Sequence, residues 1–364
     1  MDTLLAIGVV SALAAALAAA LTVAERFIAD YGACTITVND DRRFEVAGGG
    51  TLLESLSRNN LFIPSACGGR GTCAYCKVKV LEGAGPVLPT EEPYLDAAER
   101  EDGMRLSCQV KVRRDLRIRI PDELFNVRPF AASCVRIREL TRDIREFRLD
   151  LNDPAEIEYV PGQYIQLQAP AYDGNEEVYR AYSISSDPAE PDAIELVIRL
   201  VPGGICTTWC FEHLHEKDPV SFNGPYGEFR LSETDAPMIL VAGGSGMAPI
   251  KCILHHMQNR GCRRDAIYFF GANRVDELFY LDRMRQFEKD LAHFTFVPVV
   301  ARPEAGASWN GETGLVTEAL ERSLTDASKH EGYLCGSPGL IAAAREVLTK
   351  LGMPEEKIYY DAFA

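Results

Sequence analysis

The stretch SACGGRGTCAYCKVKVLEG, residues 65–83, places Cys67, Cys73 and Cys76 close together, and Cys108 follows in LSCQV. The spacing is Cys-x5-Cys-x2-Cys-x31-Cys, with three glycines in the first gap. Four thiolates can hold a [2Fe-2S] cluster, and glycine lets the loop wrap it with backbone amides near the sulfurs. A structural zinc site is the alternative, but such sites commonly use two Cys-x2-Cys pairs, and this chain has one. We therefore predict that these four cysteines ligate a [2Fe-2S] cluster.

Composition limits the other possibilities. A chain of 364 residues exceeds what one hydrophobic core usually serves, so about two to four domains are expected. Its 38 basic and 53 acidic residues give a net charge of -15, which repels phosphate backbones and argues against nucleic-acid binding. The cysteines outside the loop are scattered and form no disulfide framework, which favours metal ligation in a reducing compartment.

An uncharged and mainly apolar run extends from Thr3 to Ala24. As a helix it would be roughly 30 Å long, enough to cross a bilayer once. Arg26, Arg42 and Arg43 follow it, so the positive-inside rule places the main body in the cytoplasm. A cleaved signal peptide and a buried soluble helix are the alternatives; the first usually begins with Lys or Arg, which are absent here. We predict a single-pass anchor in the cell inner membrane over residues 1–30.

The pattern of predicted strands and helices changes twice along the rest of the chain. Alternation over Cys34–Val38 and Arg43–Val46 predicts a hairpin, and Thr51–Asn60 has leucines at helical spacing. From Arg128 to about Leu231, short strands separated by Pro, Gly and Asp are typical of a small antiparallel barrel. These strands are predicted at Ser133–Arg138, Ile144–Leu151 and Ile194–Leu200. From Pro237 onward, strands and helices alternate, which predicts a parallel sheet. Its first elements are a strand at Met238–Ala242, a helix at Pro249–Asn259 and a strand at Ala266–Phe270.

The barrel region carries signals for a flavin. An Arg-x-Tyr-Ser stretch follows PGQY, residues 161–164, and NGPYGEF lies at 223–229. The stretch consists of Arg180, Ala181, Tyr182 and Ser183. An arginine can pair with a flavin phosphate, an aromatic ring can pack on the isoalloxazine, and a hydroxyl can bond near its reacting nitrogen. Taken alone, the tetrapeptide also fits ordinary barrel surface.

A glycine pair then leads into a predicted helix over residues 203–208, whose free amides could hold the flavin pyrophosphate. The candidate residues there are Gly204, Cys206 and Thr207.

A second glycine-rich turn lies between the strand and helix that follow Pro237. It contains Gly243, Gly244, Gly246 and Met247. In this context the turn can bring a dinucleotide phosphate to a helix amino end, although such a turn can also serve strand–helix packing alone. LCGSPGL, residues 334–340, supplies another glycine-containing turn at a strand end and favours the dinucleotide interpretation.

These motifs, in this order, resemble the F subunit of the sodium-translocating NADH:quinone reductase. The cysteine loop matches its ferredoxin domain, whereas plant-type ferredoxins have four residues in the first gap and this chain has five. The flavin and nucleotide motifs resemble the ferredoxin-NADP reductase superfamily. The resemblance implies an anchor helix, an α+β β-grasp ferredoxin domain (31–125), an antiparallel β-barrel FAD domain (128–232) and an α/β Rossmann-like NAD domain (236–364). The implied cofactors are FAD, NADH and the [2Fe-2S] cluster.

The resemblance also implies roles for single residues. Cys335 and Gly336 would lie by the nicotinamide, Ser183 by the flavin, and the ring of Phe363 would cover the flavin and move aside for nicotinamide. A buried inert thiol and a frayed chain end are the plainer alternatives for Cys335 and Phe363.

The nucleotide preference rests on FGANRVDELFY, residues 270–280, which resembles the NADH-using branch. Acidic Asp276 and Glu277 would discourage a 2'-phosphate, whereas Arg274 could accept one. The histidine pairs His213 with His215 and His255 with His256 lack metal or triad partners in the sequence, so we expect them at the solvated surface.

The implied electron path runs as hydride from NADH to FAD, then as single electrons through the cluster to other subunits of a membrane redox complex and so to quinone. Two hypotheses compete with it: a reductase component that supplies an oxygenase or another acceptor protein, and a pure electron carrier with vestigial flavin and nucleotide modules. One departure bears on the partner, because only 16 residues separate Gln163 from Arg180, where F subunits carry a longer insertion. The predicted span has no charge and offers no ion pathway of its own.

Overall fold

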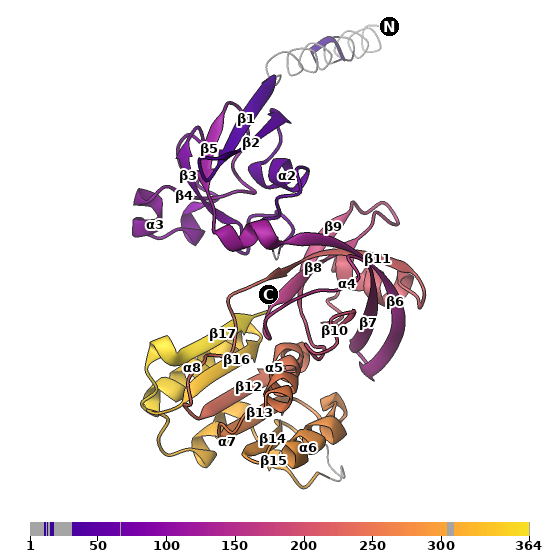
Figure 1. Ribbon diagram of the computed structural model, residues 1–364, viewed down its shortest axis with the longest axis vertical. Coiled ribbons are helices and arrows are strands. Elements are labelled where there is room, and N and C mark those ends of the chain that lie inside the picture. The colour runs from indigo at the N-terminus through magenta and orange to yellow at the C-terminus, as the bar shows by residue number, and fades with distance from the viewer. Residues whose placement is uncertain are drawn as a thin grey trace, which may run out of the picture. The chain divides into compact units, whose positions relative to one another are not determined.

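The structure, a computed structural model, describes residues 11, 13, 15–17, 31–65, 67–303 and 309–363 (Figure 1). The chain divides into two compact units, Met1–Asn126 and Val127–Ala364. The predicted membrane span, Thr3–Ala24, lies almost wholly outside the described residues. Within the part of the chain that the structure describes, no helix is long and apolar enough to cross a membrane.

The first unit is an α+β domain with a five-stranded sheet in the order β2-β1-β5-β3-β4. The predicted hairpin is confirmed, since β1 and β2 pair antiparallel, and β1 also pairs with β5 in parallel. The strands are β1 Ala33–Val38, β2 Arg42–Ala47, β3 Lys77–Glu82, β4 Met104–Leu106 and β5 Leu116–Arg119. Its helices and helical turns are α2 Leu52–Ser57, η1 Glu92–Tyr94, α3 Ala97–Glu101 and η2 Asp122–Asn126.

Helix α2 leads into the cysteine loop. It begins after Thr51, whose hydroxyl accepts a hydrogen bond from the Glu54 amide, a common way to satisfy the first turn of a helix. Leu52 and Leu56 are fully buried in the core of the unit, as their spacing predicted, but the helix ends at Ser57, earlier than the sequence indicated.

A buried ion pair fixes β4 in this unit. Glu91 is fully buried, and its carboxylate lies 2.5 Å from the guanidinium of Arg105. The same carboxylate accepts the Leu106 amide at 2.9 Å, and Arg105 also donates to the Gly85 carbonyl. Because every charged group here has partners, the pair can lie in the core without an unpaired charge.

The second unit begins with a six-stranded antiparallel sheet in the order β10-β7-β6-β11-β8-β9. The three predicted strands in this region are confirmed, and a bridge between Ile184 and Leu196 links the end of β9 to β10. The strands are β6 Arg128–Thr141, β7 Ile144–Asp153, β8 Tyr164–Ala169, β9 Val178–Ser183, β10 Ala193–Arg199 and β11 Pro219–Tyr226. A short helix, α4 Ile205–Thr208, continues into η3 Trp209–His213 and packs on the sheet.

A parallel six-stranded sheet completes the second unit, in the order β15-β14-β13-β12-β16-β17. The predicted parallel sheet is confirmed. Its strands are β12 Met238–Gly243, β13 Ala266–Ala272, β14 Phe294–Val300, β15 Glu312–Thr313, β16 Glu331–Gly336 and β17 Ile358–Ala362. Its helices and turns are η4 Gly244–Gly246, α5 Met247–Asn259, η5 Val275–Glu277, α6 Leu281–Asp290, α7 Val316–Ser323, α8 Pro338–Lys350 and η6 Glu355–Lys357.

Helices cover both faces of this parallel sheet (Figure 1). Buried residues of α5 and α6 form one core cluster with one face of the sheet, and those of α7 and α8 form another with the opposite face. The strand order reverses at β12, whose carboxyl end is Gly243. In open sheets of this kind, ligands bind at the carboxyl ends of strands where the order reverses. The fold therefore directs attention to the turn after β12.

Replacing Glu91 by alanine should leave Arg105 buried and unpaired, and we expect a loss of about 3–5 kcal/mol in the free energy of unfolding of the first unit. Hydrogen exchange of the amides of β4, followed by mass spectrometry, measures this loss locally. Lys79→Ala is the matched control, because its ion pair with Asp102 is largely solvent-exposed and should be worth less than about 1 kcal/mol. Equal exchange in the two variants would contradict the assigned importance of the buried pair.

Candidate functional site

The four predicted cluster ligands lie in one loop and one neighbouring turn of the first unit. Cys67 and Cys73 belong to the loop after α2, Cys76 immediately precedes β3, and Cys108 lies in the turn after β4. Their thiols form two pairs: Cys73 donates a hydrogen bond to Cys67, which lowers the pKa of the Cys67 thiol, and Cys76 does the same for Cys108. All eleven cysteines are free thiols.

Tight backbone turns bring the loop around these thiols. Gly71 has a φ of +76°, and a side-chain carbon added there would lie 2.7 Å from the side-chain nitrogen Nε2 of Gln109, the neighbour of Cys108. A residue with a side chain would be strained at this φ and would have to displace the Gln109 side chain. Glycine at this position therefore lets the loop close against the turn that carries the fourth thiol.

The donor set fits a [2Fe-2S] cluster, in which each of two irons takes two cysteines. Two thiol pairs in contact match that requirement. Among the described residues, no three His, Cys, Asp or Glu side chains converge as they would around one metal ion. One further atom points to this site: the hydroxyl of Ser107 is buried, lies beside the Cys76 thiol, and has no hydrogen-bond partner in the described part of the chain.

The predicted flavin residues lie on β9 and α4 of the second unit. Arg180, Ala181 and Tyr182 are partly buried, whereas Ser183, at the end of β9, is buried. Burial in this wall, and then the nearby Cys206 thiol, raise the pKa of Tyr182. The structure thus places Tyr182 of β9 against Cys206 of α4.

The loop before α4 is held by a side chain of α4 itself. Thr207 Oγ1 accepts a hydrogen bond from the Val201 amide at 3.2 Å and contacts the Gly204 carbonyl at the same distance. Gly204 is the residue that caps the helix. Because Tyr182 of β9 lies against Cys206 of α4, predicted flavin residues from two separate sequence motifs are adjacent.

The turn after β12 passes very close to β16. Gly243 ends the strand, Gly244 and Gly246 form one helical turn, and α5 begins at Met247, which is fully buried. A side-chain carbon at Gly246 would lie 2.3 Å from the carbonyl oxygen of Cys335. Only glycine allows this approach, so the glycine-rich turn and the Cys335 segment form one structural site.

Three further predicted residues meet at that site. Cys335 and Gly336 end β16, and their register partners on β17 are Asp361 and Ala362. The Phe363 amide donates to the Gly336 carbonyl at 2.8 Å, so the chain end is held by a backbone hydrogen bond. The Ser183 hydroxyl donates to a carboxylate oxygen of Asp361 at 3.3 Å, which joins the flavin barrel to the end of β17.

Asp361 is the ionisable residue that sequence reasoning missed at this point. Burial raises its pKa to about 6, although the hydrogen bond from Ser183 acts in the opposite direction. Burial also raises the pKa of the Cys335 thiol, and the neighbouring Asp361 carboxylate adds to that effect. Cys335 is therefore a neutral thiol at ordinary pH, in contact with a carboxyl group that titrates near pH 6.

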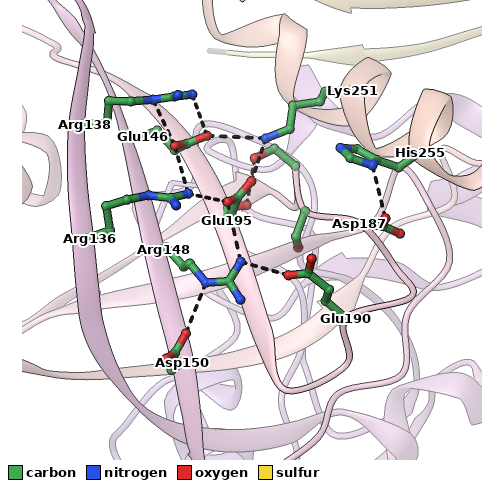
Figure 2. A network of polar contacts seen from close by, with 12 residues as sticks. Arg136, Arg138, Glu146, Arg148, Asp150, Asp187, Glu190, Glu195, Lys251 and His255 are labelled. Atoms are coloured by element: carbon green, nitrogen blue, oxygen red, sulfur yellow. Dashed lines mark hydrogen bonds and ion pairs between the residues drawn. The ribbon is translucent and has the colours of Figure 1, made fainter. Parts of the chain in front are cut away.

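A buried lysine joins α5 to the barrel. Figure 2 shows Lys251 pointing from α5 toward Glu195 of β10 and Glu146 of β7, with nitrogen–oxygen distances of 2.6 and 3.4 Å. Arg136 also reaches Glu195, at 2.6 Å. The Tyr280 hydroxyl donates to Glu146, and the Tyr280 ring lies 4.9 Å from the lysine ammonium. This network, here called the Lys251 junction, aligns α5 and the glycine-rich turn at its start with the flavin barrel.

Comparison with known families assigns all three domains. Residues 36–113 match the "2Fe-2S iron-sulfur cluster binding domain", residues 132–231 the "Oxidoreductase FAD-binding domain", and residues 240–346 the "Oxidoreductase NAD-binding domain". The F subunit of the Na(+)-translocating NADH-quinone reductase of Pseudomonas aeruginosa is 33% identical over 402 residues, covering 100% of this chain and 98% of the relative. Its counterpart in Neisseria gonorrhoeae is 31% identical over 404 residues, with both chains fully covered. The chain belongs to this family of F subunits. The resemblance seen in the sequence is confirmed, as are binding domains for FAD, NAD and a [2Fe-2S] cluster.

Solved structures extend the comparison of this family member. A cytochrome P450 reductase from Amycolatopsis superposes with a TM-score of 0.74 at 29% identity, covering 91% of this chain and 98% of that one. A ferredoxin reductase in carbazole 1,9a-dioxygenase has a TM-score of 0.71 at 24% identity, over 92% and 99% of the two chains. The latter shows the fold alone.

One expectation about the histidines is wrong. His255 is buried, not at the solvated surface, and its ring lies 3.2 Å from Asp187 (Figure 2). Burial, with Lys251 adding to it, lowers the pKa of His255 to about 4. The burial of His255 could not be predicted from the sequence, because α5 buries two faces, one against the parallel sheet and one against the antiparallel sheet. Lys251, one helical turn earlier, was missed for the same reason.

Asp361→Asn should change how stability depends on pH. The pKa of the Asp361 carboxyl, about 6, is above its ordinary value of 3.8. The stability that the protonated carboxyl gives to the folded protein is therefore fully present below about pH 4 and is lost as the pH rises through about 6. We expect the thermal midpoint of the wild-type protein to fall relative to the variant between about pH 4 and about pH 6 and to stay level with respect to it above about pH 7. Ser183→Ala, which keeps the carboxyl group, is the control and should retain that trend. A difference between wild type and Asp361→Asn that does not vary with pH would refute the assignment.

Proposed function

We propose that this chain is the NADH-oxidising subunit of a quinone-reducing membrane complex, taking hydride from NADH onto FAD and releasing single electrons through the [2Fe-2S] cluster. The observation that carries the proposal is the meeting of Ser183, Cys335 and Phe363 from three separate segments beside the Gly246 turn. When bound, the flavin converts a two-electron donor into a one-electron output. The chain supplies the positions of both cofactors and of the nucleotide.

Each predicted residue has a role in this proposal. Arg180 and the start of α4 bind the flavin phosphates, Tyr182 packs on the ring system, and Ser183 bonds near its reacting nitrogen. The residues of α4 and the loop before it are Gly204, Cys206 and Thr207. The dinucleotide phosphates contact the turn after β12, formed by Gly243, Gly244, Gly246 and Met247. Cys335 and Gly336 position the nicotinamide, and the Phe363 ring covers the flavin until nicotinamide arrives. The cluster is held by Cys67, Cys73, Cys76 and Cys108.

NADH is the proposed nucleotide. Arg274, the residue that could accept a 2'-phosphate, lies 3.1 Å from Asp276, so an acidic neighbour already engages its guanidinium. Glu277 accepts the Asn273 amide at 3.0 Å and so remains at the same turn. The Asp276 carboxylate beside the arginine, with Glu277 in the same turn, makes a dianionic phosphate unfavourable there.

The proposed location is the inner membrane, with a single span at residues 3–24 and the main body in the cytoplasm. The support is the length and apolarity of that run and the arginines that follow it. The names of the relatives place them in a sodium-translocating NADH-quinone reductase, so the proposed partners are the other subunits of such a complex.

A second function, supply of electrons to an oxygenase, is favoured by the connection between β8 and β9. It is short here, spanning residues 170–177. The alignment with the Pseudomonas relative spans 402 positions against the 364 residues of this chain, so that relative has segments without a counterpart here. The cytochrome P450 reductase matches 98% of its own length to this chain, which supports the second function.

Cys73→Ala should separate the two halves of the electron path. We expect NADH to bleach the flavin absorbance at an unchanged rate, while reduction of the one-electron acceptor cytochrome c is lost, because the flavin and cluster sites lie in different units. Cys262→Ala, a cysteine outside every predicted site, is the matched control and should keep both activities. Loss of both activities in Cys73→Ala would contradict the proposed order, and a wild-type flavin that NADH does not bleach would favour the electron-carrier hypothesis.

The acceptor is tested by affinity capture of the full chain from native membranes. We expect integral membrane subunits of a quinone reductase to be recovered with it in fixed proportion. Recovery of a soluble oxygenase component instead would support the second function.

A further inference from the structure

Ser107 lies between two of the predicted cluster ligands. Its amide donates a hydrogen bond to the Cys76 carbonyl at 2.9 Å, and the next residue in the chain is Cys108. Its carbonyl accepts the Leu53 amide at 3.1 Å, so the backbone of Ser107 is held from both sides. The position of its side chain is therefore set by the fold.

The Ser107 hydroxyl is buried without a partner. The residue has an exposed fraction of 0%, and its oxygen makes no hydrogen bond of ordinary geometry within the described residues, although it lies close enough to the Cys76 thiol to act on the pKa of that thiol. Leaving a buried hydroxyl unsatisfied costs about 1–3 kcal/mol, and nearly all such groups in native proteins have an acceptor. The Cys76 sulfur lies beside this hydroxyl. A thiolate that ligates iron carries negative charge and is a far better acceptor than a neutral thiol.

We propose that the Ser107 hydroxyl donates a hydrogen bond to the sulfur of Cys76 in the cluster-loaded protein and so raises the reduction potential of the [2Fe-2S] cluster. The inference rests on the proposed ligation by Cys67, Cys73, Cys76 and Cys108. Reduction would add one electron to the cluster and transfer no proton to or from Ser107. The added electron increases the negative charge on the sulfurs. A fixed donor stabilises the more negative, reduced form more than the oxidised form, and hydrogen bonds to sulfur are a known determinant of cluster potentials. Ser107 is thus a positioning residue that sets how readily the cluster takes an electron.

Substitution of Ser107 distinguishes the proposed role from a packing role, because only the proposed role predicts a change in the reduction potential of the cluster. Ser107→Ala removes one oxygen that has no bond to lose within the described residues, so a purely structural serine would be replaced without effect on the potential. Ser107→Thr keeps the hydroxyl and should behave like the wild-type protein. Ser55→Ala, which removes another buried serine hydroxyl of the same unit, on α2, is the matched control.

The experiment is a spectroelectrochemical titration of the cluster in the full chain, followed by electron paramagnetic resonance of the reduced state. We expect Ser107→Ala to favour the oxidised cluster by threefold to tenfold relative to wild type, where tenfold corresponds to a lowering of 59 mV for one electron. Ser107→Thr and Ser55→Ala should titrate with the wild-type protein. An iron-loaded Ser107→Ala with the wild-type potential, or an equal shift in Ser55→Ala, would overturn the inference.

Two outcomes keep this test apart from the proposed function. If the wild-type protein contains no iron and no acid-labile sulfide, the proposed ligation itself fails, and the role of Ser107 fails with it. If Ser107→Ala alone loses its iron, Ser107→Thr and Ser107→Val repeat the comparison with side chains of the same shape. A lower potential only in the variant without a hydroxyl supports the proposal, and identical potentials overturn it.

Discussion

The joint between α5 and the antiparallel sheet of the second unit depends on a buried cation, the ammonium of Lys251. It is 5% exposed and lies between Glu195 and Glu146, two carboxylates from neighbouring strands of the barrel. A charge taken out of water is tolerable only with close partners, so separating α5 from the antiparallel sheet would leave the Lys251 ammonium without its two carboxylates, whereas Glu195 and Glu146 would keep Arg136. Tyr280, which completes the junction, has a φ of +56°, a conformation that bulky residues rarely adopt. Strain accepted at a contact residue fits a junction that fixes geometry.

The Lys251 junction fixes how the glycine-rich turn after β12 approaches the antiparallel sheet that carries the predicted flavin residues. Lys251 lies about one turn from the start of α5, and the residue before that start, Gly246, touches the Cys335 carbonyl. On the same side, Ser183 of the barrel is bonded to Asp361 of β17. A hydride donor and acceptor must be held close to reacting distance. The contacts of Lys251 on one side and of Ser183 with Asp361 on the other therefore control that distance more than either sequence motif alone.

Sequence patterns predicted the local elements well because their causes are local. The hairpin of β1 and β2, strand β12 and helix α5 all follow from alternation, helical spacing and turn residues that act within about ten positions. What the sequence did not reveal depends on contacts between distant segments. Ser183 and Asp361 are 178 residues apart, and Asp361 has no motif of its own to mark it. His255 looked exposed because polarity marks the outside of a helix only when a single face is buried.

The first unit illustrates how a distant contact can control a redox site. Glu91 binds Arg105 and the Leu106 amide in the core. The next residue, Ser107, bonds through its own amide to Cys76, and Cys108 follows. Hydrogen bonds to two successive backbone amides, those of Leu106 and Ser107, therefore connect a buried ion pair to the backbone that carries the second thiol pair. Since packed interiors transmit displacements of even a few tenths of an ångström, the position of that hydroxyl and of both sulfurs is set by the charge pair as much as by the loop. On the proposed ligation, the cysteine spacing selects the metal group, and the surrounding core, through Ser107, sets how readily that group takes an electron.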